Sequence, residues 1–279
     1  MIRPRGRGAV LAIAESEFRA ALRGRLVQSF GALFGVLAIG LSLVGLGATG
    51  ELLVQGFMRT AVSLQALALY LLPLVGLVIG AHAFAGEDGG AEWLLVQPVS
   101  RAGVLLGRAL GLGAALGAVA VAGFGAAAVL VGMVAGWEGL AGYAIVAAGA
   151  TTVAWAALAT GILLGILTRR RPVAIGAALA VWLGAAVLYD LAAIGLLQLT
   201  GSGQPGPYLV SLLAINPLDG MRAAALVLLG ADVLLGPTGA AMQRALGPGG
   251  GALLVAGSVA AWCLLPIAGA IRIYRRRDF

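Results

Sequence analysis

Few side chains in this sequence could carry out covalent chemistry. The chain has one histidine, His82, one cysteine, Cys263, and no lysine, because all eighteen basic residues are arginines. Schiff-base chemistry and most nucleophile–base pairs need residue types that are missing here, and a zinc cluster needs several Cys or His ligands. A P-loop also needs a lysine for the phosphates. The sequence therefore predicts no catalytic residue, no metal site and no cofactor bound by this chain, and it assigns any ATP-driven work to another polypeptide.

The segment 86–101 is the first candidate for a binding function. It is acidic at first, then has a glycine pair that can bend freely, and then a short apolar run. Ser100 can cap the helix that follows. An exposed apolar turn rimmed by charge marks a protein contact, while packing against lipid or the protein's own helices is the alternative. The residues of this candidate site are Glu87, Asp88, Gly89, Gly90, Glu92, Trp93, Leu94, Leu95, Pro98 and Arg101.

A second candidate begins at Asn216. Asn216 is suited to cap a helix, Pro217 fits the first helical position, and Asp219 would lie near the positive end of the helix dipole. Arg222 is placed to pair with Asp219 at a spacing of i, i+3. This motif is either the start of a helix without a transport role or a functional feature of the segment that contains it.

Asp190 is the one acidic residue well inside an apolar segment. A carboxylate at a membrane centre costs about 2.5–3.5 kcal/mol on insertion scales. Asp190 lies about 28 Å along a helix from Arg171, near the far membrane edge, where that cost is smaller. Pairing with Arg222 and a role in the path of a substrate are both open. His82 is interpreted as an interfacial side chain rather than a ligand. Met58, Met133, Met221 and Met242 are interpreted as hydrophobic packing, with coordination of copper(I) by their thioethers as the alternative.

The composition places the whole chain in a membrane. Of its 279 residues, 61% are apolar and 10% are charged, and the mean hydropathy is +1.03. Soluble domains are about 25% charged. We therefore expect an all-α integral membrane protein with a single transmembrane domain over 1–279.

Six apolar segments are long enough to cross a bilayer, which takes about 20 residues per helix. They lie at about 30–48, 61–84, 103–135, 143–167, 172–199 and 252–271. The third exceeds the hydrocarbon thickness, so part of it should protrude into the cytoplasm. Residues 8–27 have the pattern of an amphipathic helix, either in the membrane interface or in solvent. The segment 200–251 should lie outside the cytoplasm and contain a short helix at 223–235.

The arginines set the expected orientation. With six spans, only Arg59, Arg222 and Arg244 fall on one side, and the other fifteen fall on the opposite side. The positive-inside rule then places both termini in the cytoplasm. The same asymmetry accounts for the net charge of +7 without nucleic-acid binding.

The 86–101 segment resembles the signature after the second span of ABC-2 type permeases, the membrane subunits of ABC exporters. The matching residues are Glu87, Gly90, Glu92, Leu94, Leu95, Pro98, Val99, Ser100 and Arg101, whereas Ala91 and Trp93 depart from the pattern. The amphipathic start is similar to the elbow helix of that family, and residues 275–279 to its basic tail. The 213–222 stretch and Tyr189-Asp190-Leu191 resemble the NosY-type permeases, which serve the maturation of nitrous oxide reductase.

This resemblance implies a permease subunit that is not an enzyme. It implies a homodimer in the inner cell membrane, with two copies of an ABC ATPase subunit that bind ATP and Mg beneath it at the 86–101 coupling loop. The implied cargo is a sulfur- or copper-related species, with a periplasmic accessory protein as a further candidate partner. An exporter of another small molecule, drug or lipid is the alternative, and a membrane scaffold or sensor without transport is a rival from another class.

The arginine count generates a test of topology. In a Cys263→Ser background, cysteines introduced at Gly6 and Arg276 should resist a membrane-impermeant thiol reagent in intact cells, because both positions are expected in the cytoplasm. A cysteine introduced at Gly203 should react, and it serves as the positive control. Labelling at position 6 from outside would overturn the orientation.

Overall fold

The computed structural model describes residues 7–47, 56–86, 100–168, 170–200, 206–228 and 250–276. Throughout these residues the regular structure is helical. Six helices in the described part are long and apolar enough to cross a membrane, which confirms the six expected spans: Arg25–Leu46, Thr60–Phe84, Arg101–Ala135, Leu140–Thr168, Arg171–Leu196 and Leu253–Arg275.

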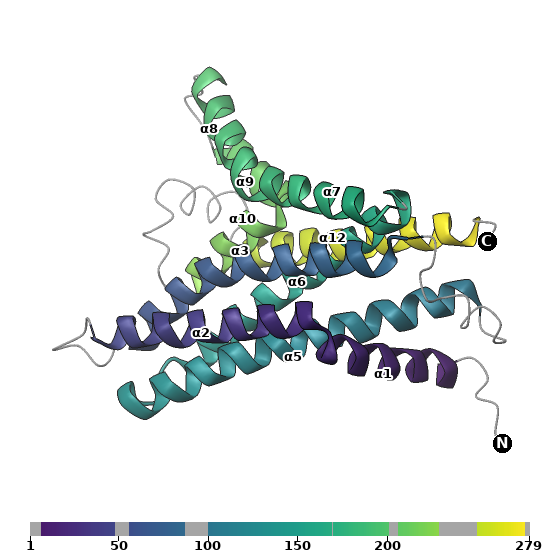
Figure 1. The fold of residues 1–279 in the computed structure, drawn as a ribbon. Helices are drawn as coiled ribbons and strands as arrows, with labels where there is room; N and C mark the ends of the chain where they lie inside the picture. The colour runs from purple at the N-terminus through teal and green to yellow at the C-terminus, as the bar shows by residue number, and fades with distance from the viewer. Residues whose placement is uncertain are drawn as a thin grey trace.

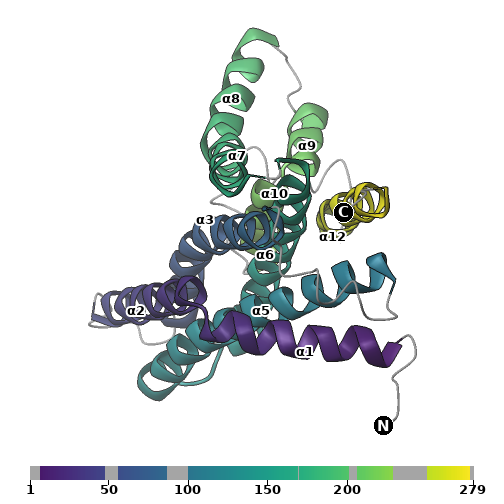
Figure 2. The same cartoon turned by 45° about the vertical axis from the view of Figure 1, so that its right-hand side comes forward.

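The helices form one bundle with both chain ends on the same side (Figure 1). The first five elements are α1 (Arg7–Arg23), α2 (Arg25–Gly47), α3 (Gly56–Phe84), α5 (Arg101–Ala135) and α6 (Leu140–Thr168). They are followed by α7 (Arg171–Leu183), the π-helix η2 (Gly184–Leu188), α8 (Tyr189–Thr200), α9 (Gly206–Ile215), α10 (Pro217–Leu228) and α12 (Gly250–Arg275). Figure 2 shows α3 and α6 at the centre, with α1, α2 and α5 on one side and α7 to α9 on the other.

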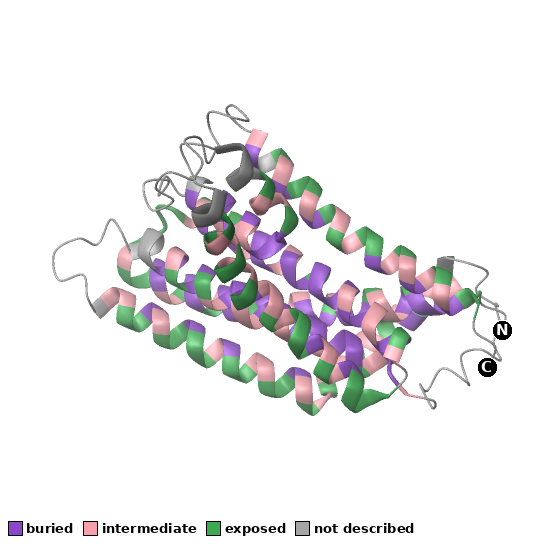
Figure 3. Ribbon diagram, turned by 90° about the horizontal axis from the view of Figure 1, so that it is seen from above, coloured by how far each residue is buried: buried purple, intermediate pink, exposed green. Residues whose placement is uncertain are grey.

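The central pair, α3 and α6, packs through glycines. A Cβ atom placed at Gly76 or Gly80 would lie 2.5 Å from the carbonyl oxygen of Ala154 or Leu158, respectively. On the facing helix, a Cβ at Gly165 would lie 2.6 Å from the Ala81 carbonyl oxygen, and one at Gly161 would meet the Leu77 carbonyl. Small residues four apart allow helices in lipid to approach at backbone distance. Buried residues accordingly gather inside the bundle, while the outer helix faces are exposed (Figure 3).

The N-terminal helix packs on the first half of α5. A Cβ at Gly107 would lie 2.9 Å from Ile13, and one at Gly111 would lie 2.5 Å from the Ala14 carbonyl oxygen. The 35 residues of α5 extend over about 52 Å, longer than the roughly 30 Å hydrocarbon core. The helix expected at 8–27 ends earlier, at Arg23, and α2 begins at Arg25 after a break at Gly24. Glycine is a poor helix former, which agrees with a break at this position.

The segment expected outside the cytoplasm contains two described helices, α9 and α10. The start of α10 at Pro217 agrees with the expected cap at Asn216, and the apolar run expected as a short helix from residue 223 forms the second half of α10 as far as Leu228. Residues 229–235 of that expected helix lie outside the described part of the chain. The fifth span is also interrupted by the π-helix η2, which the sequence pattern did not indicate.

Because α3 and α6 are in backbone contact, adding one methyl group to a glycine of this contact should destabilise the protein, whereas the same change on α2 should not. Gly161→Ala should lower the thermal midpoint of the detergent-purified protein, because overpacking costs roughly 1–3 kcal/mol. Gly35→Ala on α2 is the matched control, since a Cβ there has nothing within 4 Å. Alanine is also the better helix former, so this control should be neutral or slightly stabilising. Equal midpoints for the two variants would contradict this packing.

Candidate functional site

Asn216 connects three elements at the junction of α9 and α10. Its side chain is buried, and its Oδ1 accepts a hydrogen bond of 3.2 Å from the Leu218 backbone N–H, so Asn216 caps α10 as its position before Pro217 predicted. Its Nδ2 donates to Asp219 Oδ2 at 2.6 Å and to the Ala185 carbonyl oxygen at 2.8 Å. The cap therefore also attaches α10 to the π-helix of the fifth span.

The π-helix η2 contains the backbone carbonyl group of Ala185 to which Asn216 donates. The Tyr189 N–H donates to the Gly184 carbonyl oxygen, five residues back, and so departs from the α-helical pattern. A π-turn shifts the backbone ladder, and the Asn216 amide gives the Ala185 carbonyl a donor from another helix. One residue beyond η2, the Tyr189 hydroxyl donates to the Leu212 carbonyl oxygen at 2.7 Å. The fifth span is thus fixed to both α9 and α10.

Asp190, Asp219 and Arg222 form a compact group that we call the ionic cluster. Arg222 Nη1 lies 3.3 Å from Asp219 Oδ1 and 3.7 Å from Asp190 Oδ2. Its Nη2 donates to the Tyr70 hydroxyl at 2.6 Å, and its Cζ lies 5.4 Å from the centre of the Tyr70 ring. The pairs of Arg222 with Asp219 and with Asp190 that the sequence suggested are therefore both present in one cluster.

The cluster carries two carboxyl groups and one guanidinium. The side chain of Asp219 is 12% exposed, against 38% for Asp190 and 33% for Arg222. Burial raises the pKa of Asp219 from its ordinary 3.8 to about 6, and the negative charge of Asp190 acts in the same direction, while Arg222 opposes the shift. Asp219 therefore keeps its proton up to a higher pH than an ordinary aspartic acid does.

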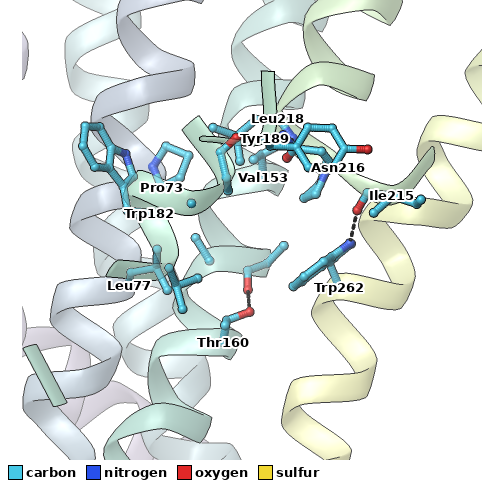
Figure 4. Close-up of a pocket in the computed structure, with 16 residues that line it drawn as sticks. Pro73, Leu77, Val153, Thr160, Trp182, Tyr189, Ile215, Asn216, Leu218 and Trp262 are labelled. Atoms are coloured by element: carbon cyan, nitrogen blue, oxygen red, sulfur yellow. Dashed lines mark hydrogen bonds between the residues drawn. The ribbon is translucent and has the colours of Figure 1, made fainter. Parts of the chain in front are cut away.

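A largely apolar cavity of about 380 Å³ lies next to the cluster, between α3, α6, the fifth span and α12 (Figure 4). Asn216, which donates to Asp219 of the cluster, also lines the cavity, as does Tyr189, the neighbour of Asp190 in the chain. The indole N–H groups of the two tryptophans in the cavity wall already donate to backbone carbonyl oxygens. Trp182 donates to the Tyr70 carbonyl at 2.9 Å, and Trp262 donates to the Ile215 carbonyl at 3.0 Å. The cavity therefore presents mainly apolar surface, with the polar cluster beside it.

Sequence reasoning missed the α3 side of this site. Gln65 is buried and donates from Nε2 to the Arg222 carbonyl oxygen at 3.2 Å, and Tyr70 contacts the Arg222 guanidinium. The available signal was the occurrence of these two polar side chains in an apolar span. Their alignment with Arg222, more than 150 residues away in the chain, depends on tertiary packing.

The other candidate site is only partly described. Nine of its residues lie outside the described part of the chain: Glu87, Asp88, Gly89, Gly90, Glu92, Trp93, Leu94, Leu95 and Pro98. Arg101 begins α5, and Ser100 caps that helix, because its Oγ accepts a hydrogen bond of 3.1 Å from the Gly103 N–H.

His82 is exposed near the end of α3. Among the described residues, no group of three or more His, Cys, Asp or Glu side chains is arranged to hold a metal ion.

Comparison with known proteins places this architecture in a family. Residues 11–279 match the model of the family described as ABC-2 family transporter protein. A protein of Stutzerimonas stutzeri named "Probable ABC transporter permease protein NosY" is 34% identical over 216 residues, which cover 74% of this chain and 77% of that protein. A Pseudomonas aeruginosa protein of the same name is 31% identical over 217 residues, covering 75% and 78% of the two chains.

The raised pKa of Asp219 predicts a pH-dependent stability. The folded protein should take up a proton near pH 6 and the unfolded chain only near 3.8, so this group contributes stability at low pH that is lost as the pH rises through 6. From pH 7.5 to 5.5 the wild type should gain on the order of 1 kcal/mol relative to Asp219→Asn, which has no carboxyl to titrate. Thermal unfolding at both pH values measures this difference. Parallel pH profiles for the two proteins would exclude a raised pKa at this position.

Proposed function

This chain belongs to the ABC-2 family of transporter proteins, and from that membership we propose that it is the membrane-spanning permease subunit of an ABC exporter. The observation that carries the proposal is the family match over residues 11–279, together with six apolar helices. The sequence has no lysine, which a P-loop requires. A separate ABC ATPase subunit, with its own ATP and Mg, would therefore supply the energy.

The proposed orientation places both termini in the cytoplasm and the protein in the inner cell membrane. Three points support it: both termini lie at one end of the bundle (Figure 1), a six-span order along the sequence would put fifteen of the eighteen arginines on one side, and α5 is longer than a bilayer requires. The packing of α1 along the first half of α5 suits an elbow helix in the cytoplasmic membrane interface. The 86–101 loop, between α3 and α5, then faces the ATPase.

The assembly that we propose is a homodimer with two ATPase subunits beneath it. Large apolar side chains remain exposed on the described helices, among them Val44 at 70%, Leu191 at 62% and Leu265 at 71%. In a membrane protein such faces meet lipid or another apolar surface. Because α7, η2 and α8 bury few of their residues within one protomer, the fifth span is a suitable element for the contact between two copies.

The ionic cluster is the proposed polar part of the transport path. Ionisable residues in membrane proteins face the bundle interior or a water-filled cavity, since charge in contact with lipid is costly. Asp190 and Arg222 are each about one-third exposed, so the cluster keeps an open face. We assign this face to the outer part of the route, where the cargo would leave the permease.

The proposed cargo is a sulfur- or copper-related species for the maturation of nitrous oxide reductase, passed on to a periplasmic accessory protein. The support is the NosY name of the two similar proteins and the polar cluster. A second candidate is export of another small molecule, drug or lipid, which the apolar cavity beside the cluster favours. A neighbouring gene for nitrous oxide reductase would support the first candidate over the second.

Binding of the ATPase subunit to the coupling loop tests the proposed function directly. Trp93→Ala should lower the affinity for the purified ATPase by about 30-fold, or about 2 kcal/mol, because a buried aromatic anchor carries most of the energy of such a contact. Glu87→Lys should cost less, since rim charges influence orientation more than affinity.

Trp137→Ala is the matched control for loss of a tryptophan, because Trp137 follows the opposite end of α5. The thermal midpoint of each variant establishes that it is folded. Full ATPase binding by Trp93→Ala would place the docking site elsewhere. A wild-type chain that binds no ABC ATPase would refute the permease function itself.

A further inference from the structure

The C-terminal end of α3 is held by an arginine of α5. Arg108 lies in the second turn of α5, and its Nη2 donates to the Ala83 carbonyl oxygen at 2.9 Å. Its Cζ also lies 4.6 Å from the centre of the Phe84 ring. Only 11% of the Arg108 side chain is exposed, so these contacts are largely shielded from water. Charge-assisted hydrogen bonds of this kind are stronger than neutral ones.

A second arginine reaches the same helix end from another helix. Arg171 begins α7, and its Nε donates to the Ala85 carbonyl oxygen at 3.2 Å. The guanidinium lies against Gly86, which has a φ of +121° and so leaves the helical path. The last carbonyl groups of a helix lack partners within the helix and form the negative end of its dipole. Two guanidinium groups from two other helices therefore complete the end of α3.

The N-terminal helix joins this arrangement through Glu17. Glu17 Oε1 lies 3.5 Å from Arg108 Nη2, and the Glu17 side chain is 22% exposed. The glycine contacts of α5 at Gly107 and Gly111 hold α1 at the same level. A single partly buried arginine therefore connects α1, α5 and the end of α3. Together with Arg171, it links four helices at the point where the chain enters the 87–99 loop.

We propose that Arg108 and Arg171 are positioning residues that lock the end of α3 to α1, α5 and α7, so that these helices move as one body when the ATPase acts on the adjoining loop. This inference rests on the proposed function. Its physical basis is that helix ends fray easily, and a frayed end of α3 would absorb the motion of the loop. The arginine clamp, meaning Arg108 and Arg171, prevents that loss by satisfying the final carbonyl groups from neighbouring helices.

The test separates coupling from docking in the complex of permease and ATPase, reconstituted in lipid nanodiscs. In Arg108→Gln and Arg171→Gln, the affinity for the ATPase subunit and the KM for ATP should remain within about 2-fold of wild type. The permease-stimulated rate of ATP hydrolysis should fall roughly 10-fold, since residues that couple two sites alter that coupling by up to about 2 kcal/mol. Arg108→Lys should restore part of the rate, because it keeps the charge and donor groups but not the planar fork.

Arg272→Gln is the matched control, because Arg272 is an exposed arginine in the last turn of α12. It should hydrolyse ATP at the wild-type rate. If Arg108→Gln does not fold, Arg171→Gln decides the question, since the exposed Arg171 is the safer position to change.

Two results would overturn the clamp as a coupling device. The first is wild-type stimulation in both glutamine variants. The second is a loss of the ATP hydrolysis rate that is fully explained by an equal loss of thermal stability or of ATPase binding. In that case the two arginines would only stabilise the end of α3. If the wild-type chain itself gives no stimulation of the ATPase, the proposed function fails, and that outcome is distinct from either of these.

Discussion

The backbone contact between α3 and α6 is the constraint on which the rest of the structure depends. Lipid is as apolar as the side chains, so helices in a bilayer gain little from the hydrophobic effect and rely on close packing. Gly76 and Gly80 of α3 lie against the α6 backbone, and Gly161 and Gly165 of α6 lie against the α3 backbone, all at distances that leave no room for a Cβ atom. This contact fixes the rotation of α3 about its own axis. Every side chain that α3 presents to another helix is positioned by that rotation.

Arginines from other parts of the chain contact α3 at two places. Gln65 and Tyr70, in the first half and at the middle of the helix, contact Arg222 of α10, and Arg108 and Arg171 bind the last carbonyl groups at its C-terminal end. The glycine contact lies between these two regions. A shift of α3 against α6 would therefore disturb both arginine sites, which gives the helix a physical means of relating its C-terminal end to the ionic cluster.

Sequence reasoning could predict those features that depend on local pattern. Length and hydropathy predicted the six spans, and the order Asn216-Pro217 predicted a capped helix. The π-helix at Gly184–Leu188 could not be predicted in this way, because a shifted hydrogen-bond ladder leaves no mark on hydrophobic periodicity. The contact of Tyr70 with Arg222 was equally hidden, since it depends on two helices far apart in the chain.

The ionic cluster also explains an exception in the arginine distribution. Arg222 is one of three arginines that the proposed orientation places outside the cytoplasm, where the positive-inside rule disfavours them. Two carboxyl groups, one tyrosine hydroxyl and one aromatic ring surround its guanidinium, so its charge is compensated locally. The cluster therefore accounts for an arginine at this position, and the proposed orientation rests on the other arginines. Because Asn216 bonds both to Asp219 and to the π-helix, a movement of the fifth span would alter the environment of Arg222, and the charge of the cluster would thereby respond to the conformation of the bundle.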